Sequence, residues 1–250
     1  MKIVGIIPAR YASTRFPGKP LCLIGNRTMI RRVYDQAMQC SLLDKVLVAT
    51  DDQRIFDHVA DFGEVVMTGE HHQSGTDRCL EAATLLSKEQ PLDDHDVIIN
   101  IQGDEPFIQP EQIETLARLF SLPETNIGTL ARKIQPKEDI HNENMVKVAF
   151  DQRGMALYFS RWPIPFYRGK PMSVWANEYT YYHHLGLYGY RLGTLKKLAG
   201  LPQSSLEKAE SLEQLRWLQN GYRIQVAITS LYSPGIDTPD DLKKILPDSL

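Results

Sequence analysis

Three cations and two hydroxyl groups lie close together near the start of the chain. The run PARYASTRFPGKP at positions 8–20 holds Arg10, Arg15, Lys19, Ser13 and Thr14. Gly18 allows the backbone to approach a ligand closely. This set suits a polyphosphate whose negative charge grows as it leaves a reaction centre. The GxxxxGK[ST] spacing of a P-loop is absent, and a solvated basic loop is the alternative interpretation.

Two carboxylates are candidates for holding a metal ion against phosphate oxygens. Asp104 lies in the run QGDEP at 102–106, and Asp237 lies in GIDTPDD at 235–241. Mg²⁺ commonly binds one or two carboxylates together with substrate phosphates. Asp104 is favoured over Glu105, because a short side chain keeps the ion near the backbone. The alternatives are a turn-forming Asp104 and an Asp237 that merely precedes the cap of a helix at Thr238.

Three other polar groups of residues have ordinary structural explanations. The run HHQSGTDR at 71–78 leads into a predicted helix, whose first turn either binds polar ligand groups or is capped by Ser74 or Thr76. His183 and His184 are neighbours on a predicted strand, so their side chains point to opposite faces and joint metal binding is not expected. The acids of the run 207–213 recur every three residues, which is typical of a solvated face on one helix.

The elements that position these residues alternate between strands and helices in the first half of the chain. Short apolar runs at 2–7, 45–49, 64–67 and 97–101 predict buried strands, and the segments between them have helical periodicity. Such alternation predicts right-handed βαβ units and a mostly parallel sheet. In such a sheet ligands bind at the carboxyl ends of strands, where the runs at 8–20 and 102–106 begin.

The second half of the chain has a different pattern. The sequence predicts a β-hairpin over 146–150 and 156–159, a Pro- and aromatic-rich loop over 162–175, strands over 185–190 and 224–228, and one helix through 206–218. No internal repeat or linker is evident. We therefore expect a single domain spanning 1–250 that carries a β-rich excursion.

Composition narrows the class of protein. The chain has 250 residues and a formal net charge of −3, which gives no reason to expect nucleic acid or an anionic membrane as a partner. The apolar run at the N-terminus is too short for a signal peptide, and no later run reaches membrane length. The three cysteines show no CxxC spacing, so reduced, mostly buried thiols in the cytoplasm are expected.

Eight blocks of sequence resemble one enzyme family in the family's own order. The run IIPARYASTRFPGKPL is similar to the signature loop of 3-deoxy-manno-octulosonate cytidylyltransferases, also called CMP-Kdo synthetases. The resemblance continues through VATDD, HQSGTDR, NIQGDEPFI, ALYFSR, HLGLYGYR, ESLEQLR and GIDTPDDL, and so covers essentially the whole chain. The stretch 166–182 departs from the family, in which its length varies, so contacts there are not transferred.

The resemblance implies a fold, a reaction and a set of site residues. The fold is a Rossmann-like nucleotidyltransferase fold, similar to glycosyltransferase A: an α/β architecture with a mostly parallel central sheet, helices on both faces and a β-rich dimerisation excursion at about 130–190. The implied reaction joins CTP to 3-deoxy-manno-octulosonate (Kdo) in a cytoplasmic homodimer and serves lipopolysaccharide biosynthesis. The nucleotide would meet Pro8, Arg10, Ser13, Lys19, Ala49, Asp51, Ser74, Gly75, Arg78 and Gln102. The sugar would meet Arg161, His184, Tyr188, Glu210 and Gln214. Mg²⁺ would be held by Asp104 and Asp237, which with Arg10 and Lys19 form the catalytic set.

Three other functions are alternatives at this stage. A cytidylyltransferase for a related acid, either 8-amino-Kdo or a sialic acid, would share the chemistry. A glycosyltransferase of similar architecture would use an acidic metal motif but would not need the cationic loop for a leaving pyrophosphate. A catalytically silent binding module would be expected to lack Lys19, Asp104 or Asp237, and all three are present.

Overall fold

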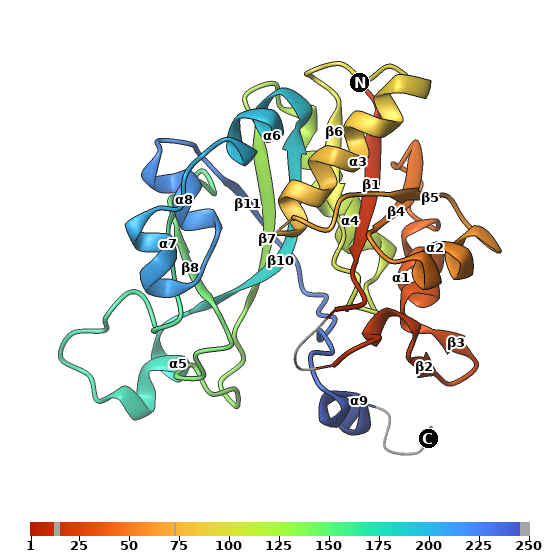
Figure 1. Cartoon of the computed structure of the whole chain (residues 1–250). Helices are drawn as coiled ribbons and strands as arrows, with labels where there is room; N and C mark the ends of the chain where they lie inside the picture. Colours follow the sequence, from red (N-terminus) through yellow and green to blue (C-terminus); the bar gives the residue numbers. More distant parts are fainter. Residues whose placement is uncertain (13–15, 73, 246–250) are drawn as a thin grey trace.

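A mixed β-sheet runs through the centre of the protein (Figure 1). The computed structural model describes residues 1–12, 16–72 and 74–245, and within them nine strands join this sheet. The spatial order of its main path is β11 (Gln225–Ile228), β7 (Ile127–Lys133), β10 (Tyr182–Arg191), β6 (Val97–Asn100), β1 (Ile3–Ala9), β4 (Lys45–Thr50) and β5 (Val65–Met67).

The direction of the strands confirms the predicted mostly parallel sheet. β1 pairs in parallel with β4 and β6, β4 with β5, and β11 with β7. β10 is antiparallel to both of its neighbours in the main path, β6 and β7. The predicted hairpin is present as β8 (Lys147–Phe150) and β9 (Ala156–Ser160). It joins β10 through β8, a pairing that the sequence did not predict.

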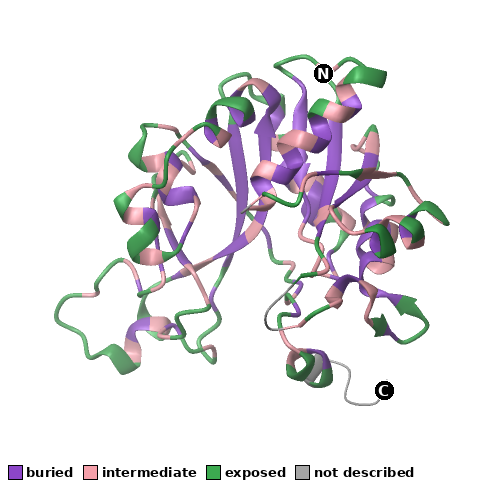
Figure 2. Cartoon of the chain, in the orientation of Figure 1, coloured by how far each residue is buried: buried purple, intermediate pink, exposed green. Residues whose placement is uncertain are grey.

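Helices cover both faces of the sheet, because neighbouring strand residues point to opposite sides. Ile3 and Ile7 pack into one core with α1 (Met29–Ala37), α2 (Gln53–Ala60) and α4 (Pro110–Arg118). Val4 and Ile6 pack into the other core with α3 (Gly75–Glu89), α6 (Leu192–Ala199) and α8 (Gln214–Gln219). Figure 2 shows the buried strands between these two helical layers.

Smaller elements complete the two ends of the structure. A 3-10 turn, η1 (Lys19–Leu21), and the hairpin β2 (Leu23–Ile24) and β3 (Arg27–Thr28) follow the cationic loop, and η2 (Leu119–Ser121) follows α4. The C-terminal helix α9 (Pro239–Ile245) docks beside them through a small apolar cluster of Ile24, Met29, Ile236 and Leu242. In the β-rich region, η3 (Met172–Val174) leads into α5 (Trp175–Glu178), whose buried Trp175 packs with Tyr181 in a separate apolar cluster.

Two features differ from the sequence-based expectation. The single helix predicted through 206–218 is wrong: α7 (Ser205–Glu210) and α8 are separate helices, and Ser211 between them has a left-handed backbone with φ of 52°. The strand β7 was not anticipated. Gly128 within it gives no strand signal, yet a Cβ there would come within 3.1 Å of Leu116 and 3.2 Å of Phe120, so this glycine lets the helix pack closely against the strand.

Candidate active site

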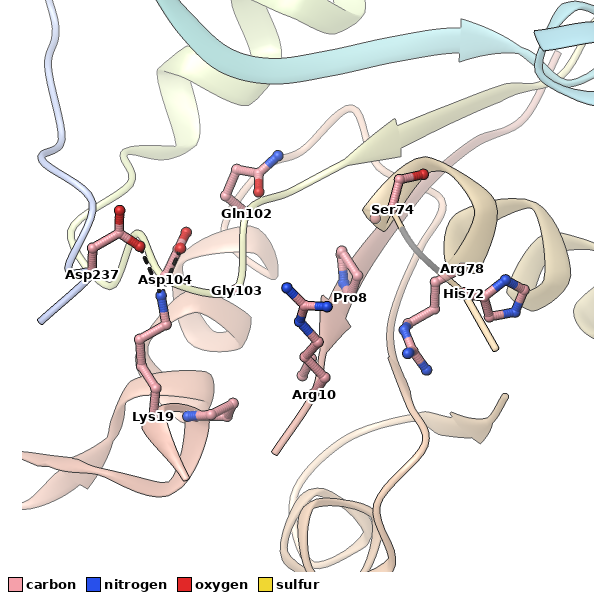
Figure 3. A pocket seen from close by; sticks show the side chains of 13 residues that line it. Pro8, Arg10, Lys19, His72, Ser74, Arg78, Gln102, Gly103, Asp104 and Asp237 are labelled. Atoms are coloured by element: carbon pink, nitrogen blue, oxygen red, sulfur yellow. Dashed lines mark hydrogen bonds and ion pairs between the residues drawn. The ribbon is translucent and has the colours of Figure 1, made fainter. Parts of the chain in front are cut away.

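A polar cavity of about 250 Å³ opens at the carboxyl ends of β1 and β6 (Figure 3). This is the edge of the sheet where the sequence placed the site. Segments that are far apart in the chain line the cavity: the end of β1, the start of η1, the first turn of α3, the loop after β6 and the strand-like segment before α9. The lining residues are Pro8, Ala9, Arg10, Lys19, Pro20, His72, Ser74, Gly75, Arg78, Gln102, Gly103, Asp104 and Asp237.

Close backbone contacts hold these segments together. A Cβ on Gly103 would lie 2.7 Å from the carbonyl oxygen of Pro8, so only glycine lets the loop after β6 pass the end of β1. Gly75 is also tightly packed, because a Cβ there would lie 3.3 Å from Pro8. The backbone N–H of Ile236 donates to the carbonyl oxygen of Asp104 at 2.9 Å, which ties the C-terminal segment to the same loop.

The two candidate carboxylates converge on one ammonium group. Lys19 Nζ lies 2.8 Å from Asp104 Oδ2 and 3.3 Å from Asp237 Oδ1, and Figure 3 shows the lysine between them. The alternative interpretation, a helix cap at Thr238, is also correct, but the cap is formed by Thr238 and Asp241 and does not use the Asp237 carboxylate. Asp241 N donates to Thr238 Oγ1 at 3.2 Å and Asp241 Oδ2 accepts from Thr238 N at 2.9 Å, which leaves the Asp237 carboxylate directed toward Lys19.

This pair of carboxylates fits a magnesium ion. The carboxylates of Asp104 and Asp237 converge on one position, which the ammonium group of Lys19 occupies. Mg²⁺ usually takes one or two protein carboxylates and completes its shell with waters and substrate phosphates. Within the described part of the chain, no cluster of three or more His, Cys, Asp or Glu side chains is arranged to hold a metal, so water or substrate oxygens would supply the remaining ligands of a metal here.

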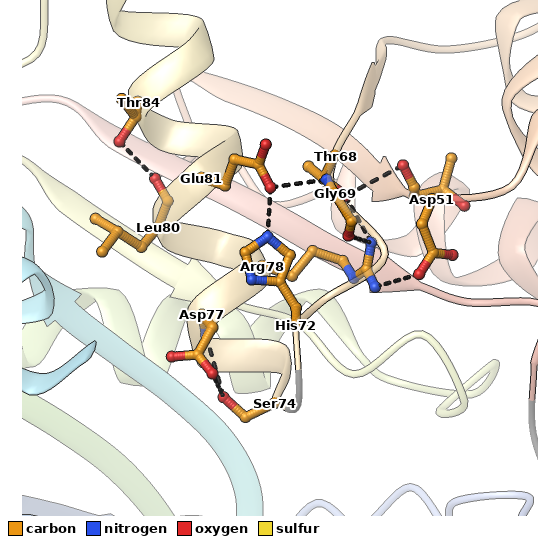
Figure 4. A network of polar contacts seen from close by, with 11 residues as sticks. Asp51, Thr68, Gly69, His72, Ser74, Asp77, Arg78, Leu80, Glu81 and Thr84 are labelled. Atoms are coloured by element: carbon orange, nitrogen blue, oxygen red, sulfur yellow. Dashed lines mark hydrogen bonds and ion pairs between the residues drawn. The ribbon is translucent and has the colours of Figure 1, made fainter. Parts of the chain in front are cut away.

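A buried arginine organises the wall beside the cavity (Figure 4). Arg78 exposes 3% of its surface, and it donates to Thr68 Oγ1 at 2.6 Å and to Asp51 Oδ2 at 2.5 Å. Ser74 caps α3 by accepting from the N–H of Asp77 at 3.1 Å. Arg78 therefore fixes the carboxyl end of β4 against the first turn of α3, and its guanidinium is largely consumed by protein partners.

The remaining predicted nucleotide residues fall into three groups. Pro8, Arg10, Gly75 and Gln102 line the cavity with Ser74 and Arg78. Ala49 is fully buried within β4, and Asp51 reaches the site only through Arg78. Ser13 lies outside the described residues.

His72 lines the cavity, although no role of its own is predicted for it from the sequence. Its Nε2 hydrogen-bonds Glu81 Oε2, and the same oxygen accepts from the N–H of Gly69 at 2.9 Å. Glu81 lies on α3, so the loop that precedes the helix is fastened to the helix itself (Figure 4). In the sequence, the only indication of this contact is that His72 and Glu81 lie nine positions apart. That spacing is too weak to identify the contact without the fold.

None of the five predicted sugar residues, all of which the structure describes, lines the cavity. Arg161 follows β9, and its side chain donates to the carbonyl oxygens of Glu210 at 2.7 Å, Glu143 at 2.9 Å and Ser211 at 3.3 Å. The Glu210 carboxylate accepts from Ser160 Oγ at 2.8 Å and from Arg161 N at 2.9 Å. Arg161 and Glu210 are thus brought together, across the junction of β9 and α7.

A second group of predicted sugar residues lies on β10 and α8. The rings of His184 and Tyr188 are 5.3 Å apart, and the Tyr188 ring is 5.1 Å from Trp217. Burial lowers the pKa of His184 to about 3, so its imidazole is neutral and hydrogen-bonds Thr129 Oγ1 at 3.0 Å. Gln214 is buried at the start of α8. A shared contact of both groups with one sugar stays a prediction.

The acids of the α7–α8 region each have a partner, so a solvated acidic face is wrong. Glu207 pairs with Arg216 at 2.5 Å, Glu210 accepts from Ser160, and Glu213 accepts from Thr76 Oγ1 at 2.8 Å. The break at Ser211 turns these side chains in different directions, which one continuous helix would not allow.

Comparisons with known proteins agree with this geometry. The sequence profile of the family described as Cytidylyltransferase matches residues 4–224. A 3-deoxy-manno-octulosonate cytidylyltransferase of Parabacteroides distasonis is 52% identical, covering 98% of this chain and 97% of the relative. One of Bacteroides thetaiotaomicron is 53% identical, covering 97% and 96%. The chain belongs to the 3-deoxy-manno-octulosonate cytidylyltransferase family.

Solved structures place the fold in the same group. A CMP:2-keto-3-deoxy-manno-octonic acid synthetase in complex with CTP is similar with a TM-score of 0.88 and 41% identity, covering 98% of this chain and 97% of that one. A 4-diphosphocytidyl-2C-methyl-D-erythritol synthase is similar in fold, with a TM-score of 0.63 at 14% identity. The Rossmann-like nucleotidyltransferase fold predicted from the sequence is confirmed.

Proposed function

We propose that the protein transfers CMP from CTP to the anomeric hydroxyl of Kdo, which yields CMP-Kdo and pyrophosphate. The observation that carries this proposal is the near-full-length identity of about half of all residues to curated enzymes of that name. The cavity supports it, because it places three cations, Arg10, Lys19 and Arg78, and two carboxylates at the carboxyl edge of the sheet.

The cationic side of the cavity suits the triphosphate. Arg10 is exposed at the end of β1, and Lys19 opens η1 on the opposite wall. Arg10 can contact phosphate oxygens directly. Lys19 can do so once it leaves Asp104 and Asp237. The first turn of α3 offers the backbone N–H groups of a helix N-terminus beside Ser74 and Gly75, and such groups favour hydroxyl and phosphate oxygens. Gln102 supplies an amide next to them, with its Nε2 held by the carbonyl of Gly186 at 2.9 Å.

The reaction needs positioning and charge neutralisation more than covalent chemistry. The sugar hydroxyl attacks the α-phosphorus in line, and pyrophosphate leaves toward Arg10 and Lys19, whose charges meet the negative charge that develops there. Asp104 and Asp237 would hold Mg²⁺, which when bound acts as a Lewis acid on phosphate and lowers the pKa of a coordinated hydroxyl. Lys19 therefore has two positions: between the carboxylates in the free protein, and on the phosphates when the metal and CTP are bound.

We assign the β-rich region to formation of a homodimer. Large apolar side chains are exposed there, at Leu157, Trp162, Phe166, Met172 and Tyr179. An apolar surface of this kind is typical of a protein contact. Light scattering coupled to gel filtration tests this: we expect twice the chain mass for the wild-type protein and a shift toward the monomer for Trp162→Ser.

We also propose a cytoplasmic location and a role in lipopolysaccharide biosynthesis, as the family resemblance implies. Among the described helices, none is both long and apolar enough to cross a membrane. Fractionation of cells that produce the protein tests the location, and recovery in a membrane pellet would contradict it.

One panel of assays tests the function and its alternatives together. Pyrophosphate release is measured with each of the four nucleoside triphosphates, combined with Kdo, 8-amino-Kdo and sialic acid. We expect release with CTP and Kdo above all other pairs. A preference for 8-amino-Kdo or sialic acid would keep the reaction and change the substrate. Release with no acid sugar at all would overturn the assignment.

A further inference from the structure

A fully buried lysine lies beneath the sugar half of the site. Lys147, the first residue of β8, exposes 0% of its surface. Its ammonium donates to the main-chain carbonyl oxygens of Asn142, at 3.0 Å, and of Arg161. Within the described part of the chain, this cation is thus satisfied by neutral carbonyls rather than by an ion pair.

The two carbonyl groups belong to segments that also hold Arg161. The side chain of Arg161 donates to the carbonyl of Glu143, which adjoins Asn142, while its N–H donates to the carboxylate of Glu210. Lys147 also lies opposite Ser160 in the β8–β9 ladder, and Ser160 Oγ donates to the same carboxylate. Removal of the Lys147 ammonium would therefore loosen the Arg161 peptide. The contacts of the Arg161 side chain and those of the Glu210 carboxylate both depend on the position of this peptide.

A buried lysine is a costly way to make such a contact. Burial lowers the pKa of Lys147 to about 8, because the charged form is poorly solvated there. Methionine would fill nearly the same space without that cost, and replacing buried charges by apolar residues is often neutral or stabilising. A residue that makes the fold less stable and yet holds a binding site in place is expected to be needed for function rather than for stability.

We propose that Lys147 is a positioning residue for the acid sugar: it holds the peptide at Arg161 so that the Arg161 side chain and the Glu210 carboxylate keep the arrangement that receives the sugar. This inference rests on the proposed function. It assigns Lys147 an effect on sugar binding alone, since its contacts lie in the 142–161 region and not at the cavity that suits CTP.

The first test is Lys147→Met, with Lys137→Met as the matched control. Lys137 is an exposed lysine in the same connection between β7 and β8. We expect the KM for Kdo to rise about tenfold or more in Lys147→Met, because the Arg161 peptide is then no longer held in the arrangement that receives the sugar. The dissociation constant for CTP, measured by calorimetry, and the melting temperature at pH 7 should not worsen. Lys147→Arg keeps a donor and should recover much of the affinity for Kdo.

The second test needs no variant. The charged groups around Lys147 are Asp139 from the β7–β8 connection, Glu210 from α7 and Arg161 after β9. His183 on β10 also faces it, but burial lowers the pKa of His183 to about 4, so its ring is neutral in the pH range of this test. Since charge-assisted hydrogen bonds are stronger than neutral ones, the KM for Kdo of the wild-type protein should rise above about pH 8 as the ammonium loses its proton. The KM of Lys147→Met should show no such rise.

The outcomes separate this inference from the proposed function. Normal turnover by a folded Lys147→Met with an unchanged KM for Kdo overturns the inference, as does an equal loss of CTP affinity. If Lys147→Met does not fold, a flat wild-type KM between pH 7 and pH 10 overturns it instead. Absence of CTP- and Kdo-dependent turnover by the wild-type protein overturns the proposed function and this inference together.

Discussion

Replacing Lys19 by methionine should make the site, without nucleotide, bind a divalent ion more tightly. The ammonium lies 2.8 Å from Asp104 Oδ2 and 3.3 Å from Asp237 Oδ1, where it competes with any metal for the same oxygens. Methionine keeps a similar length and removes the charge. The two carboxylates then repel each other, and a divalent ion relieves that repulsion.

The magnitude follows from two partly exposed contacts. The side chains of Lys19, Asp104 and Asp237 expose 14%, 31% and 50% of their surfaces, so water screens both ion pairs. Such pairs contribute about 0.2–1 kcal/mol each, and the closer, less exposed one belongs at the upper end. Loss of both should strengthen metal binding by about 1–2 kcal/mol, which is about tenfold in the dissociation constant.

The assay is a titration with Mn²⁺ followed by electron paramagnetic resonance, without nucleotide. Lys45→Met is the matched control: Lys45 exposes 15% of its side chain and pairs with Glu64 at 2.6 Å, at the start of β4 and so at the far end of the sheet. We expect tighter Mn²⁺ binding in Lys19→Met only. The same variant should release pyrophosphate about 10²-fold more slowly, because no ammonium meets the leaving group. Equal or weaker Mn²⁺ binding in Lys19→Met would refute the assignment of the two carboxylates to a metal.

Four further variants or profiles test separate parts of the structure. Asp237→Asn should lower turnover by about 10²-fold or more with the fold intact, whereas Thr238→Ala should cost about 1 kcal/mol of stability through the helix cap and keep most activity; equal activity losses in steady-state assays would contradict the division. Arg78→Lys should raise the KM for CTP, because lysine cannot donate to two partners in the fixed geometry of a guanidinium; an unchanged KM would show that the α3 wall tolerates the loss. His184→Gln should leave the pH profile of kcat/KM unchanged between pH 5 and 9, since the His184 pKa of about 3 keeps the ring neutral; loss of a pH-dependent limb would show that the ring titrates. Between about pH 8 and 10.5 the stability of the wild-type protein in urea unfolding should rise relative to that of Lys147→Met, by up to about 3 kcal/mol, because the unfolded state binds the Lys147 proton and the folded state does not; both proteins share the opposite effect of the buried Cys79 thiol, whose pKa burial raises, and an unchanged difference between the two proteins would place the titration elsewhere.

The parts of the site that the sequence predicted are those with a local signal. Asp104 and Arg10 come directly after apolar runs, and parallel strands bring their carboxyl ends to one edge of the sheet. The cap at Thr238 is likewise a local pattern of residue types. Each of these patterns involves only residues that are a few positions apart, so it can be recognised without knowledge of the fold.

The parts that it missed depend on contacts between distant segments. Ser211 adopts a left-handed backbone that is unusual for a residue other than glycine, and it does so between Glu210, which is bound to Ser160, and Glu213, which is bound to Thr76. Neither Ser160 nor Thr76 is near in sequence, so the local pattern does not distinguish one continuous helix from two separate helices. The ion pairs of Lys19 span 85 and 218 positions, and only the fold brings them together.

The transfer itself is tested most directly by phosphorus NMR of the reaction of the wild-type protein with CTP, Kdo and Mg²⁺. Attack at the α-phosphorus predicts equal amounts of two products, a new phosphodiester between CMP and the sugar and free pyrophosphate, with no signal from inorganic phosphate. Release of inorganic phosphate with CDP, or loss of CTP without a sugar phosphodiester, would contradict the account.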